Sequence, residues 1–331
     1  MDRADLLVEP VALPKQQVYD GDAFPLVLVC QSTNATLDDV HQWVEAHRDE
    51  LNRSVAAHGA ILFRRFPIQA AHDFDAFVTA FGYRNFPYDK SHSNAVRLNR
   101  TDRVFTANEA PPDVTIYLHH EMAQTPVYPS KLFFFCEQAA ATGGATPICR
   151  SDILLEKLTG EAPQFVRDCE AKGLKYTNVM PSEADLASGM GRSWQSTLSS
   201  PSQAEAEGRL RELGYSWQWL DDGSLRATTP VLPAVRELVC GRKSFFNQLI
   251  AASFGWKDSR NDPSKAITYG DGSALDRDGV ALAASLAEEL TFDIPWQGGD
   301  VALVDNFVTM HGRRSYKGTR KVLASLVACE D

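Results

Sequence analysis

Two blocks of short apolar strands, far apart in the chain, constrain the fold more than any other feature of this sequence. The first block, at about 104–150, contains KLFFFCEQ and ATPICR, and the second, at about 295–331, contains VALVDN and RKVLASLVAC. Short apolar runs bounded by turn residues are typical of strands. Since strands are stable only when they pair, we expect the two blocks to close one sheet system. A jelly-roll barrel is the most economical solution.

The rest of the chain is expected to flank or interrupt this barrel within a single domain, 1–331. A helical and strand flank is predicted at about 1–100, where Thr36 caps a helix that Gly59 ends. A mixed insertion is predicted at about 151–294. Its expected elements are helices at 151–159, 161–172, 204–213 and 280–290, and a hairpin at 216–228. The predicted fold class is therefore mainly β with a helical flank (α+β), around a jelly-roll core.

Charge and apolar content argue against several classes of function. The formal net charge of −10 disfavours binding to nucleic acid or to an anionic membrane, because both are bound mainly through Lys and Arg. The chain starts without the basic and apolar segments of a secretory signal, and its apolar runs are too short to span a bilayer. The six cysteines include no C-x-x-C pair. We expect a cytoplasmic, reduced protein without a cysteine metal site.

The first signal of chemistry is the tripeptide His119-His120-Glu121. Side chains alternate between the two faces of a strand, so His119 and Glu121 are expected to share a face and His120 to point away. One imidazole and one carboxylate are two of the ligands of a two-histidine, one-carboxylate iron site. Alone, the tripeptide is a weak signal, because polar strand residues in this order are common.

The third ligand would be a histidine from a distant strand. The chain has eight histidines, and His92 lies in a polar loop. Four others lie in or beside the predicted N-terminal helices: His41, His47, His58 and His72. This leaves His311, which follows an apolar strand and is expected at a strand end. Two histidines and a carboxylate leave three coordination positions open, which suits Fe(II) and O₂.

An ordered series of sequence blocks resembles the TauD/TfdA family of Fe(II)/2-oxoglutarate dioxygenases. The blocks are LHHEMA, FFFCEQAAATGGATPICRSDILLEKL, GRSWQSTL, SWQWLDDGSLRATTP, SFFNQ and IPWQGGDVALVDNFVTMHGRRSYKGTRKVLAS. Within that family, the chain is most similar to the branch of syringomycin-biosynthesis-type hydroxylases with clavaminate-synthase-like relatives. The likeness covers nearly the whole chain from about residue 45.

The resemblance implies a double-stranded β-helix core in which His119, Glu121 and His311 bind Fe(II). It also implies that 2-oxoglutarate chelates the iron through its keto-acid end. An arginine and a threonine would hold the far carboxylate, since a guanidinium fork and a hydroxyl suit a buried carboxylate. Thr146 fits the threonine, with 24 residues between it and Glu121.

The arginine of this clamp is assigned to Arg320. Only eight residues separate Arg320 from His311, fewer than in many relatives, but Gly318-Thr319-Arg320-Lys321 matches the shorter turn of the branch. Lys321 is the alternative, because neighbours on a strand face opposite ways. For these residues, as for Arg313 and Arg314, the competing interpretation is a solvated basic turn.

Several further residues are candidates for contact with the substrate. They are Asn108, Arg192, Asn247, Arg313 and Arg314. The arginines would suit a substrate carboxylate. For the two asparagines the competing interpretation is a turn amide that caps the backbone. Trp194, Trp217, Trp219 and Trp296 are expected in the core, and Asp300 is expected to shape a turn before its strand.

The predicted function is that of an Fe(II)/2-oxoglutarate dioxygenase that hydroxylates an unactivated C–H bond. Its cofactors would be Fe(II), 2-oxoglutarate and O₂. The substrate would be a small molecule, an amino acid or a derivative of one, free or tethered to a carrier protein, in antibiotic or other natural-product biosynthesis. The oligomeric state is left open.

Other activities stay possible on this sequence. Glu121 argues against halogenation, because related halogenases carry a small residue in its place. Desaturation and cyclisation need the same iron ligands. A cupin-like binding protein or a zinc hydrolase would be the alternatives from other classes, but a hydrolase would leave Thr146 and Arg320 unexplained.

Overall fold

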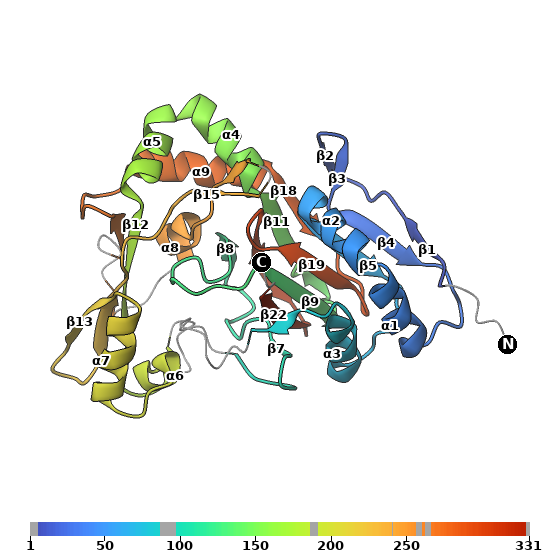
Figure 1. Ribbon diagram of the computed structural model, residues 1–331, viewed down its shortest axis with the longest axis horizontal. Coiled ribbons are helices and arrows are strands. Elements are labelled where there is room, and N and C mark those ends of the chain that lie inside the picture. The colour runs from blue at the N-terminus through green and yellow to red at the C-terminus, as the bar shows by residue number, and fades with distance from the viewer. Residues whose placement is uncertain are drawn as a thin grey trace.

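The core of the molecule consists of two sheets that face each other in a computed structural model (Figure 1), which describes residues 6–86, 97–185, 191–239, 241–255, 260–261 and 266–328. His92, Cys240 and Cys329 lie outside these residues. In spatial order, the larger sheet contains β1 (Val8–Pro10), β4 (Leu26–Cys30), β5 (Ala60–Arg64), β19 (Val301–Asp305), β9 (Lys131–Gln138), β22 (Lys321–Ala328) and β6 (Arg84–Asn85). The short strand β7 (Phe105–Thr106) also pairs with β22.

The smaller sheet contains the strands that carry His119 and His311. Its order is β18 (Thr291–Ile294), β11 (Thr146–Arg150), β20 (Thr309–Arg313) and β8 (Ile116–His119). In both sheets strands from the two distant blocks pair: β9 lies between β19 and β22, and β11 lies between β18 and β20. The predicted fold class, mainly β with a helical flank around a double-stranded β-helix core, is confirmed.

The central strand β9 has two apolar faces, which explains its uninterrupted apolar sequence. Leu132, Phe134 and Cys136 belong to the core between the two sheets. Phe133 and Phe135 belong to a second core, in which the outer face of the larger sheet packs against helices. The alternation of side chains along a strand divides this one run between two cores.

Three helices form that second core: α1 (Leu37–Ala46), α2 (Arg48–His58) and α3 (Ala71–Ala80). The hydroxyl of Thr36 accepts from the backbone N–H of Asp39, as the capping sequence predicts. The predicted helix is interrupted at His47 and ends at Gly59, which adopts the left-handed conformation (φ 75°). The N-terminal flank also contributes β4 and β5 to the larger sheet, so it is part of the barrel wall as well as its cover.

The insertion forms a lobe beside the barrel, on the side opposite α1 and α3 (Figure 1). A four-stranded sheet runs through it in the order β13 (Ser216–Trp219), β14 (Leu225–Thr228), β12 (Leu174–Met180) and β17 (Ile267–Tyr269). Its helices are α4 (Ser151–Glu161), α5 (Pro163–Lys172), α6 (Trp194–Leu198), α7 (Gln203–Glu212), α8 (Leu249–Gly255) and α9 (Arg277–Glu289). Because β18 pairs with β11, the barrel resumes at Thr291, slightly before the boundary predicted from the sequence.

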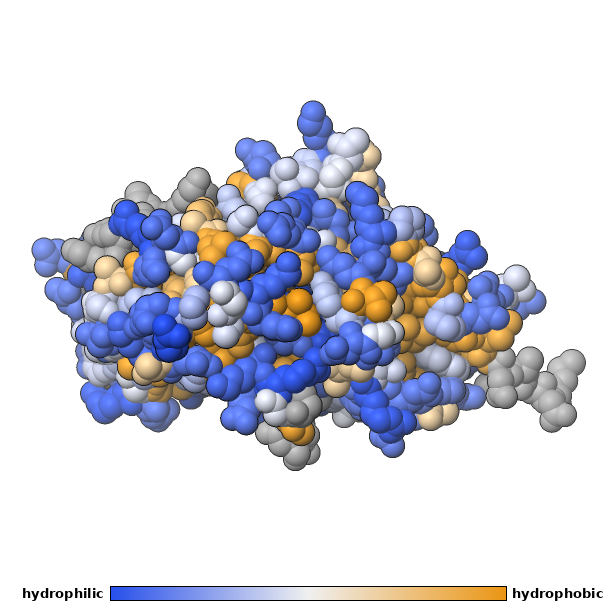
Figure 2. Space-filling view, turned by 90° about the horizontal axis from the view of Figure 1, so that it is seen from above, coloured by the Kyte–Doolittle hydropathy of each residue, from blue (hydrophilic) through white to orange (hydrophobic). Residues whose placement is uncertain are grey.

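Three strand pairs lie outside these sheets: β2 (Gln17–Tyr19) with β3 (Asp22–Phe24), β10 (Thr142–Gly143) with β21 (Tyr316–Lys317), and β15 (Arg236–Glu237) with β16 (Lys243–Ser244). On the face shown in Figure 2, polar residues surround small apolar patches. None of the helices that the structure describes has the length and apolar content needed to cross a membrane.

One buried ion pair joins the N-terminal flank to the barrel. Arg64, at the end of β5, donates to both carboxylate oxygens of Asp300, at 3.0 and 2.7 Å. It also donates to the carbonyl of Pro295 (2.8 Å), and Asp300 accepts from the backbone of Gln297 (2.9 Å). The side chains are 9% and 1% exposed. Asp300 therefore shapes the predicted turn and also fixes β5 beside β19.

Replacement of Arg64 by Met should destabilise the protein strongly, because it leaves the Asp300 carboxylate buried without its cation. We expect a loss of about 3–5 kcal/mol of unfolding free energy, measured by urea denaturation. The matched control is Arg314→Met, which breaks partly exposed ion pairs with Glu288 and Asp293 and should cost about 0–1 kcal/mol for each pair. Equal losses in the two variants would contradict this prediction.

Candidate active site

The two predicted histidine ligands face each other across neighbouring antiparallel strands. His119, the last residue of β8, is paired in register with His311 on β20. Their ring centroids are 4.4 Å apart. His311 lies in the middle of its strand rather than at the predicted strand end, and Glu121 lies beyond the end of β8 rather than on it. Strand alternation was therefore an incomplete reason for placing Glu121 beside His119.

The position of Glu121 depends on Asn306, a fully buried residue from the loop before β20. The backbone N–H of Glu121 donates to the side-chain oxygen of Asn306 (2.8 Å), and the Asn306 amide donates back to the carbonyl of Glu121 (3.0 Å). His120 points away from the site, as predicted, and its Nδ1 donates to the carbonyl of Asn306 (2.5 Å). Met122 then turns the chain with a left-handed φ of 59°.

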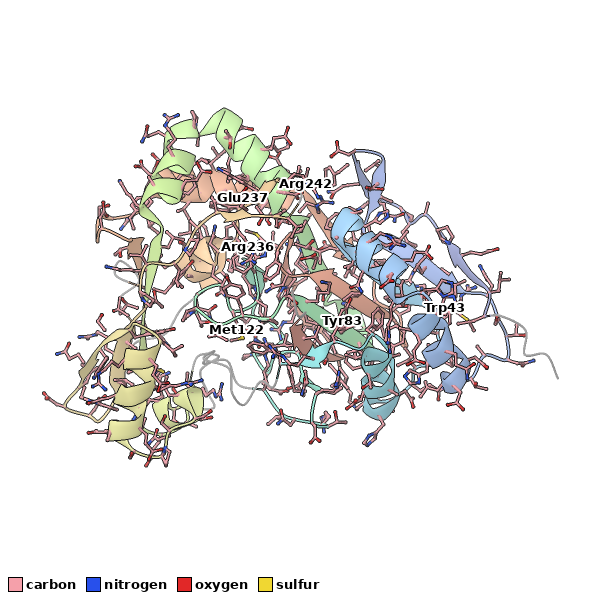
Figure 3. All side chains as sticks on the ribbon, viewed as in Figure 1. Trp43, Tyr83, Met122, Arg236, Glu237 and Arg242 are labelled. Carbon is pink, nitrogen blue, oxygen red and sulfur yellow. The ribbon has the colours of Figure 1, made fainter. Side chains whose placement is uncertain are left out.

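Within the part of the chain that the structure describes, one group of side chains could hold a metal ion: His119, Glu121 and His311, with ligand atoms within 4.8 Å of one another. Figure 3 shows Met122, the residue after Glu121, in the region between the barrel and the lobe. Two imidazoles and one carboxylate suit Fe(II).

The protonation states also fit a metal. Nδ1 of His119 donates to the carbonyl of Tyr117 (2.8 Å), which leaves Nε2 as the lone-pair donor. Burial lowers the pKa of His119 to about 4, so the ring is neutral near pH 7. Burial by itself would raise the pKa of Glu121, but Arg97 and His311 outweigh it and hold that pKa below its usual range. The site therefore presents a neutral imidazole at His119 and an ionised carboxylate at Glu121.

Among the described residues, Glu121 has a close cationic partner, Arg97, that the sequence did not predict. Nη2 of Arg97 lies 2.8 Å from Oε1 of Glu121, and both side chains are buried. The other carboxylate oxygen, Oε2, lies 3.4 Å from Nε2 of His311.

A small cavity opens beside the ligands, inside the barrel. Its lining includes Arg97, Asn108, His119, Thr146, His311 and Arg320. The lining also includes Phe134 and Val322, from the core between the sheets, so the wall combines polar and apolar side chains. Such a lining suits a small molecule with both charged and apolar groups.

Arg320 and Thr146, which both line the cavity, form a candidate carboxylate site. Arg320 donates from Nε to the carbonyl of Gly144 (2.8 Å), and its Nη2 lies 3.3 Å from the hydroxyl of Thr146. Among the described residues, no carboxylate forms an ion pair with Arg320. Burial, and secondarily the charge of Arg313, lower the pKa of Arg320 to about 10. A bound carboxylate would neutralise this buried cation.

The hydroxyl group of Thr146 can donate a hydrogen bond to such a carboxylate. Its hydroxyl oxygen accepts from the indole N–H of Trp296 (2.9 Å) and lies within reach of Arg320. Because both neighbours are donors, the hydroxyl hydrogen is left for an anion. Trp296, which the sequence assigned to the core, therefore has a contact at the site.

The structure also distinguishes Arg320 from Lys321, the alternative candidate for the carboxylate clamp in the sequence. Lys321 does not line the cavity, and its side chain is 55% exposed beside Glu137 (3.9 Å). Arg320 thus fits the role of the carboxylate clamp, and Lys321 does not.

Two of the predicted substrate residues do line the cavity. The side-chain oxygen of Asn108 accepts from the backbone of Ala110 (2.6 Å), which leaves its NH₂ group to donate to a substrate. Arg313 is buried, and its guanidinium donates to the carbonyls of Ala110, Pro111 and Val114. Arg313 therefore holds the loop of Ala110, Pro111 and Val114, and it also lines the cavity.

The other three predicted substrate residues do not line the cavity. Arg313 is the last residue of β20, and Arg314, just beyond the strand, pairs with Glu288 and Asp293. Arg192 donates to Ser196 at the start of α6, in the lobe. Asn247 is buried and caps the start of α8 through the backbone of Leu249, as the competing interpretation proposed.

Comparisons with known proteins give relatives in sequence and in fold. A family model described as "Taurine catabolism dioxygenase TauD, TfdA family" matches residues 22–326. A clavaminate synthase-like protein of Arabidopsis thaliana is 39% identical over 329 residues, 98% of this chain and 99% of the relative. Dapdiamide synthesis protein DdaC of Enterobacter agglomerans is 31% identical over 289 residues, 81% of this chain and 82% of the relative. A crystal structure of a taurine dioxygenase from Burkholderia xenovorans has a TM-score of 0.53 at 14% identity, covering 99% and 92% of the two chains.

Replacement of Asn306 by Ala should weaken metal binding, because it removes both side-chain contacts that fix the backbone of Glu121. We expect an affinity for Mn²⁺ lower by about 10–100-fold, measured by calorimetry on protein shown to be folded by circular dichroism. Asn52→Ala is the control, since Asn52 contacts Tyr83 beside α2 and lies outside the site. A folded Asn306→Ala variant with unchanged affinity would refute this positioning role.

Proposed function

Because the chain belongs to the TauD/TfdA family of dioxygenases, it is a 2-oxoglutarate-dependent non-haem iron enzyme, and we propose that it hydroxylates an amino acid or an amino-acid derivative. Enzymes of this family use Fe(II), 2-oxoglutarate and O₂. The observation that supports the assignment of residues is one cavity lined by His119 and His311, which group with Glu121 as candidate metal ligands, and also by Thr146 and Arg320.

In the proposed arrangement, His119, Glu121 and His311 hold Fe(II), and Arg320 and Thr146 hold the far carboxylate of 2-oxoglutarate. The bound iron supplies oxidation by O₂, in which 2-oxoglutarate becomes succinate and CO₂ and one oxygen atom enters the substrate. The protein positions the two reactants and excludes water from the apolar wall of the cavity. Asn108 and the loop held by Arg313 lie where a substrate would contact the site.

Two kinds of observation support an amino-acid substrate. One curated relative is named for clavaminate synthase and the other for dapdiamide synthesis, and both align over most of their length. The cavity is also rich in guanidinium groups, which favour a ligand with a carboxylate. A free amino acid is small enough to enter as it is, whereas a carrier-tethered one would need the carrier to dock at the cavity mouth.

The test is a screen for substrate-stimulated succinate release. Free amino acids and carrier-tethered aminoacyl groups are incubated with Fe(II), 2-oxoglutarate and O₂, and products are identified by mass spectrometry. Gain of one oxygen atom supports hydroxylation, whereas loss of two hydrogen atoms indicates desaturation or cyclisation. Glu121→Ala is the inactive control. Succinate release that no amino acid or aminoacyl group stimulates would refute the proposed substrate class.

Replacement of Arg320 by Met should weaken the binding of 2-oxoglutarate, because the far carboxylate loses its charged donor. We expect a dissociation constant higher by roughly 10–100-fold, which corresponds to about 1.5–3 kcal/mol for a hydrogen bond to a charged group. The measurement is an anaerobic titration of the Fe(II) protein, followed by the visible charge-transfer band of bound 2-oxoglutarate.

Arg320→Lys should retain part of the affinity, since it keeps the charge but not the fork. The matched control is Lys321→Met, which removes the neighbouring exposed cation and should bind 2-oxoglutarate as the wild type does. The assignment would be wrong if Lys321→Met were the weaker binder of the two methionine variants.

A further inference from the structure

Arg97 contacts Glu121 from a segment that is hydrogen-bonded to the barrel wall. The backbone of Leu98 exchanges hydrogen bonds with Thr106, which donates from its own N–H (2.9 Å) and accepts through its hydroxyl (3.0 Å). Asn99 forms a bridge with Phe105, and β7 is paired with the long strand β22. The Arg97 guanidinium lies 5.3 Å from the ring centre of Phe105. The residues that follow Arg97 are thus tied to the larger sheet through β7.

The two oxygens of the Glu121 carboxylate have different surroundings. Oε1 accepts from Nη2 of Arg97 at 2.8 Å, and Oε2 lies 3.4 Å from Nε2 of His311, on the side where the ligand atoms converge. The side chains of Arg97 and Glu121 are 7% and 5% exposed. In this environment a charged hydrogen bond is strong, because little water competes for the carboxylate.

The difference between the two carboxylate oxygens matters because Fe(II) has a limited number of coordination positions. A two-histidine, one-carboxylate site leaves three positions open when each residue supplies one atom. The keto-acid end of 2-oxoglutarate takes two of them, and O₂ needs the third. A glutamate can also bind a metal through both oxygens, as carboxylates do elsewhere. If Glu121 did so, it would fill the position that O₂ requires.

We propose that Arg97 is a positioning residue that keeps Oε1 of Glu121 away from the iron, so that the carboxylate binds through Oε2 alone and one position stays open for O₂. The inference rests on the proposed metal site of His119, Glu121 and His311. A guanidinium suits this task, because it is always charged and donates in a fixed plane. The role differs from that of Asn306, which fixes the backbone of Glu121 rather than its carboxylate.

The experiment uses nitric oxide as a probe of the open position, since it binds Fe(II) where O₂ would and does not start turnover. Wild-type, Arg97→Met and Arg97→Lys proteins are loaded with Fe(II) and 2-oxoglutarate without oxygen. The charge-transfer band reports bound 2-oxoglutarate, and electron paramagnetic resonance reports bound nitric oxide. Arg103→Met is the matched control, because Arg103 lies on the same segment but pairs with Asp75 of α3.

We expect Arg97→Met to keep the charge-transfer band but to bind nitric oxide at least about tenfold more weakly than the wild type. Arg97→Lys should recover part of the signal, and Arg103→Met should match the wild type. Nitric oxide binding by Arg97→Met at the wild-type level would overturn the proposal. So would loss of both metal and 2-oxoglutarate from this variant, because Arg97 would then be needed for the site as a whole.

The outcome for the wild type separates this inference from the proposed function. If the wild-type protein gave no charge-transfer band, the proposed iron and 2-oxoglutarate site would be wrong, and the inference would fall with it. If the band formed, the comparison among the arginine variants would decide the role of Arg97, whatever the substrate is. No substrate is added, so an error in the proposed substrate class leaves the result unchanged.

Discussion

The pairing of β8 with β20 is the interaction on which the site depends. It puts His119 directly opposite His311, although the two residues come from opposite ends of the barrel sequence. The approach of the strands is close after His311: a side chain on Gly312 would come within 2.5 Å of the carbonyl of Ile116. The register also shifts between His311 and Arg313, where the sheet is irregular. A slip of one residue would turn His311 away from the cavity, so the iron site and the sheet register are specified together.

Beyond the strand end, polar contacts take over from sheet pairing. Glu121 has no strand partner, and Asn306 supplies a donor and an acceptor to its backbone in place of one. The carboxylate is buried, which is costly unless it is paired, and Arg97 offsets that cost. The ligand set therefore consists of two residues placed by a β-ladder and one placed by buried polar contacts. This division explains why Asn306 and Arg97 act on different parts of the same glutamate.

Sequence alone predicted the parts of the molecule that follow from local periodicity or from ordered motifs. The capping box at Thr36, the strands around Phe133, and the grouping of His119, Glu121 and His311 could all be predicted in this way. Contacts set by tertiary packing could not be predicted. Asn306 lies 185 residues from Glu121, and Arg97 sits in a short polar stretch that resembles many exposed ones. The same limit explains why Arg313 and Arg314 seemed equivalent in the sequence, whereas in the structure Arg313 ends β20 and lines the cavity and Arg314, just beyond the strand, pairs with Asp293.

The charges in the cavity bear on the kind of substrate that would bind. Arg97, Arg313 and Arg320 line it, and Glu121 is the one acid among the candidate ligands. Fe(II) and the dianion 2-oxoglutarate cancel each other when both are bound, so the cavity keeps an excess of positive charge. The chain as a whole carries a formal net charge of −10, and a cationic cavity inside an acidic protein concentrates the field at its mouth. An anionic or zwitterionic substrate would gain most from that field, and a carboxylate on the substrate would reduce the repulsion among the three guanidinium groups. This electrostatic argument favours an amino acid with a free carboxylate over one whose carboxylate is esterified to a carrier.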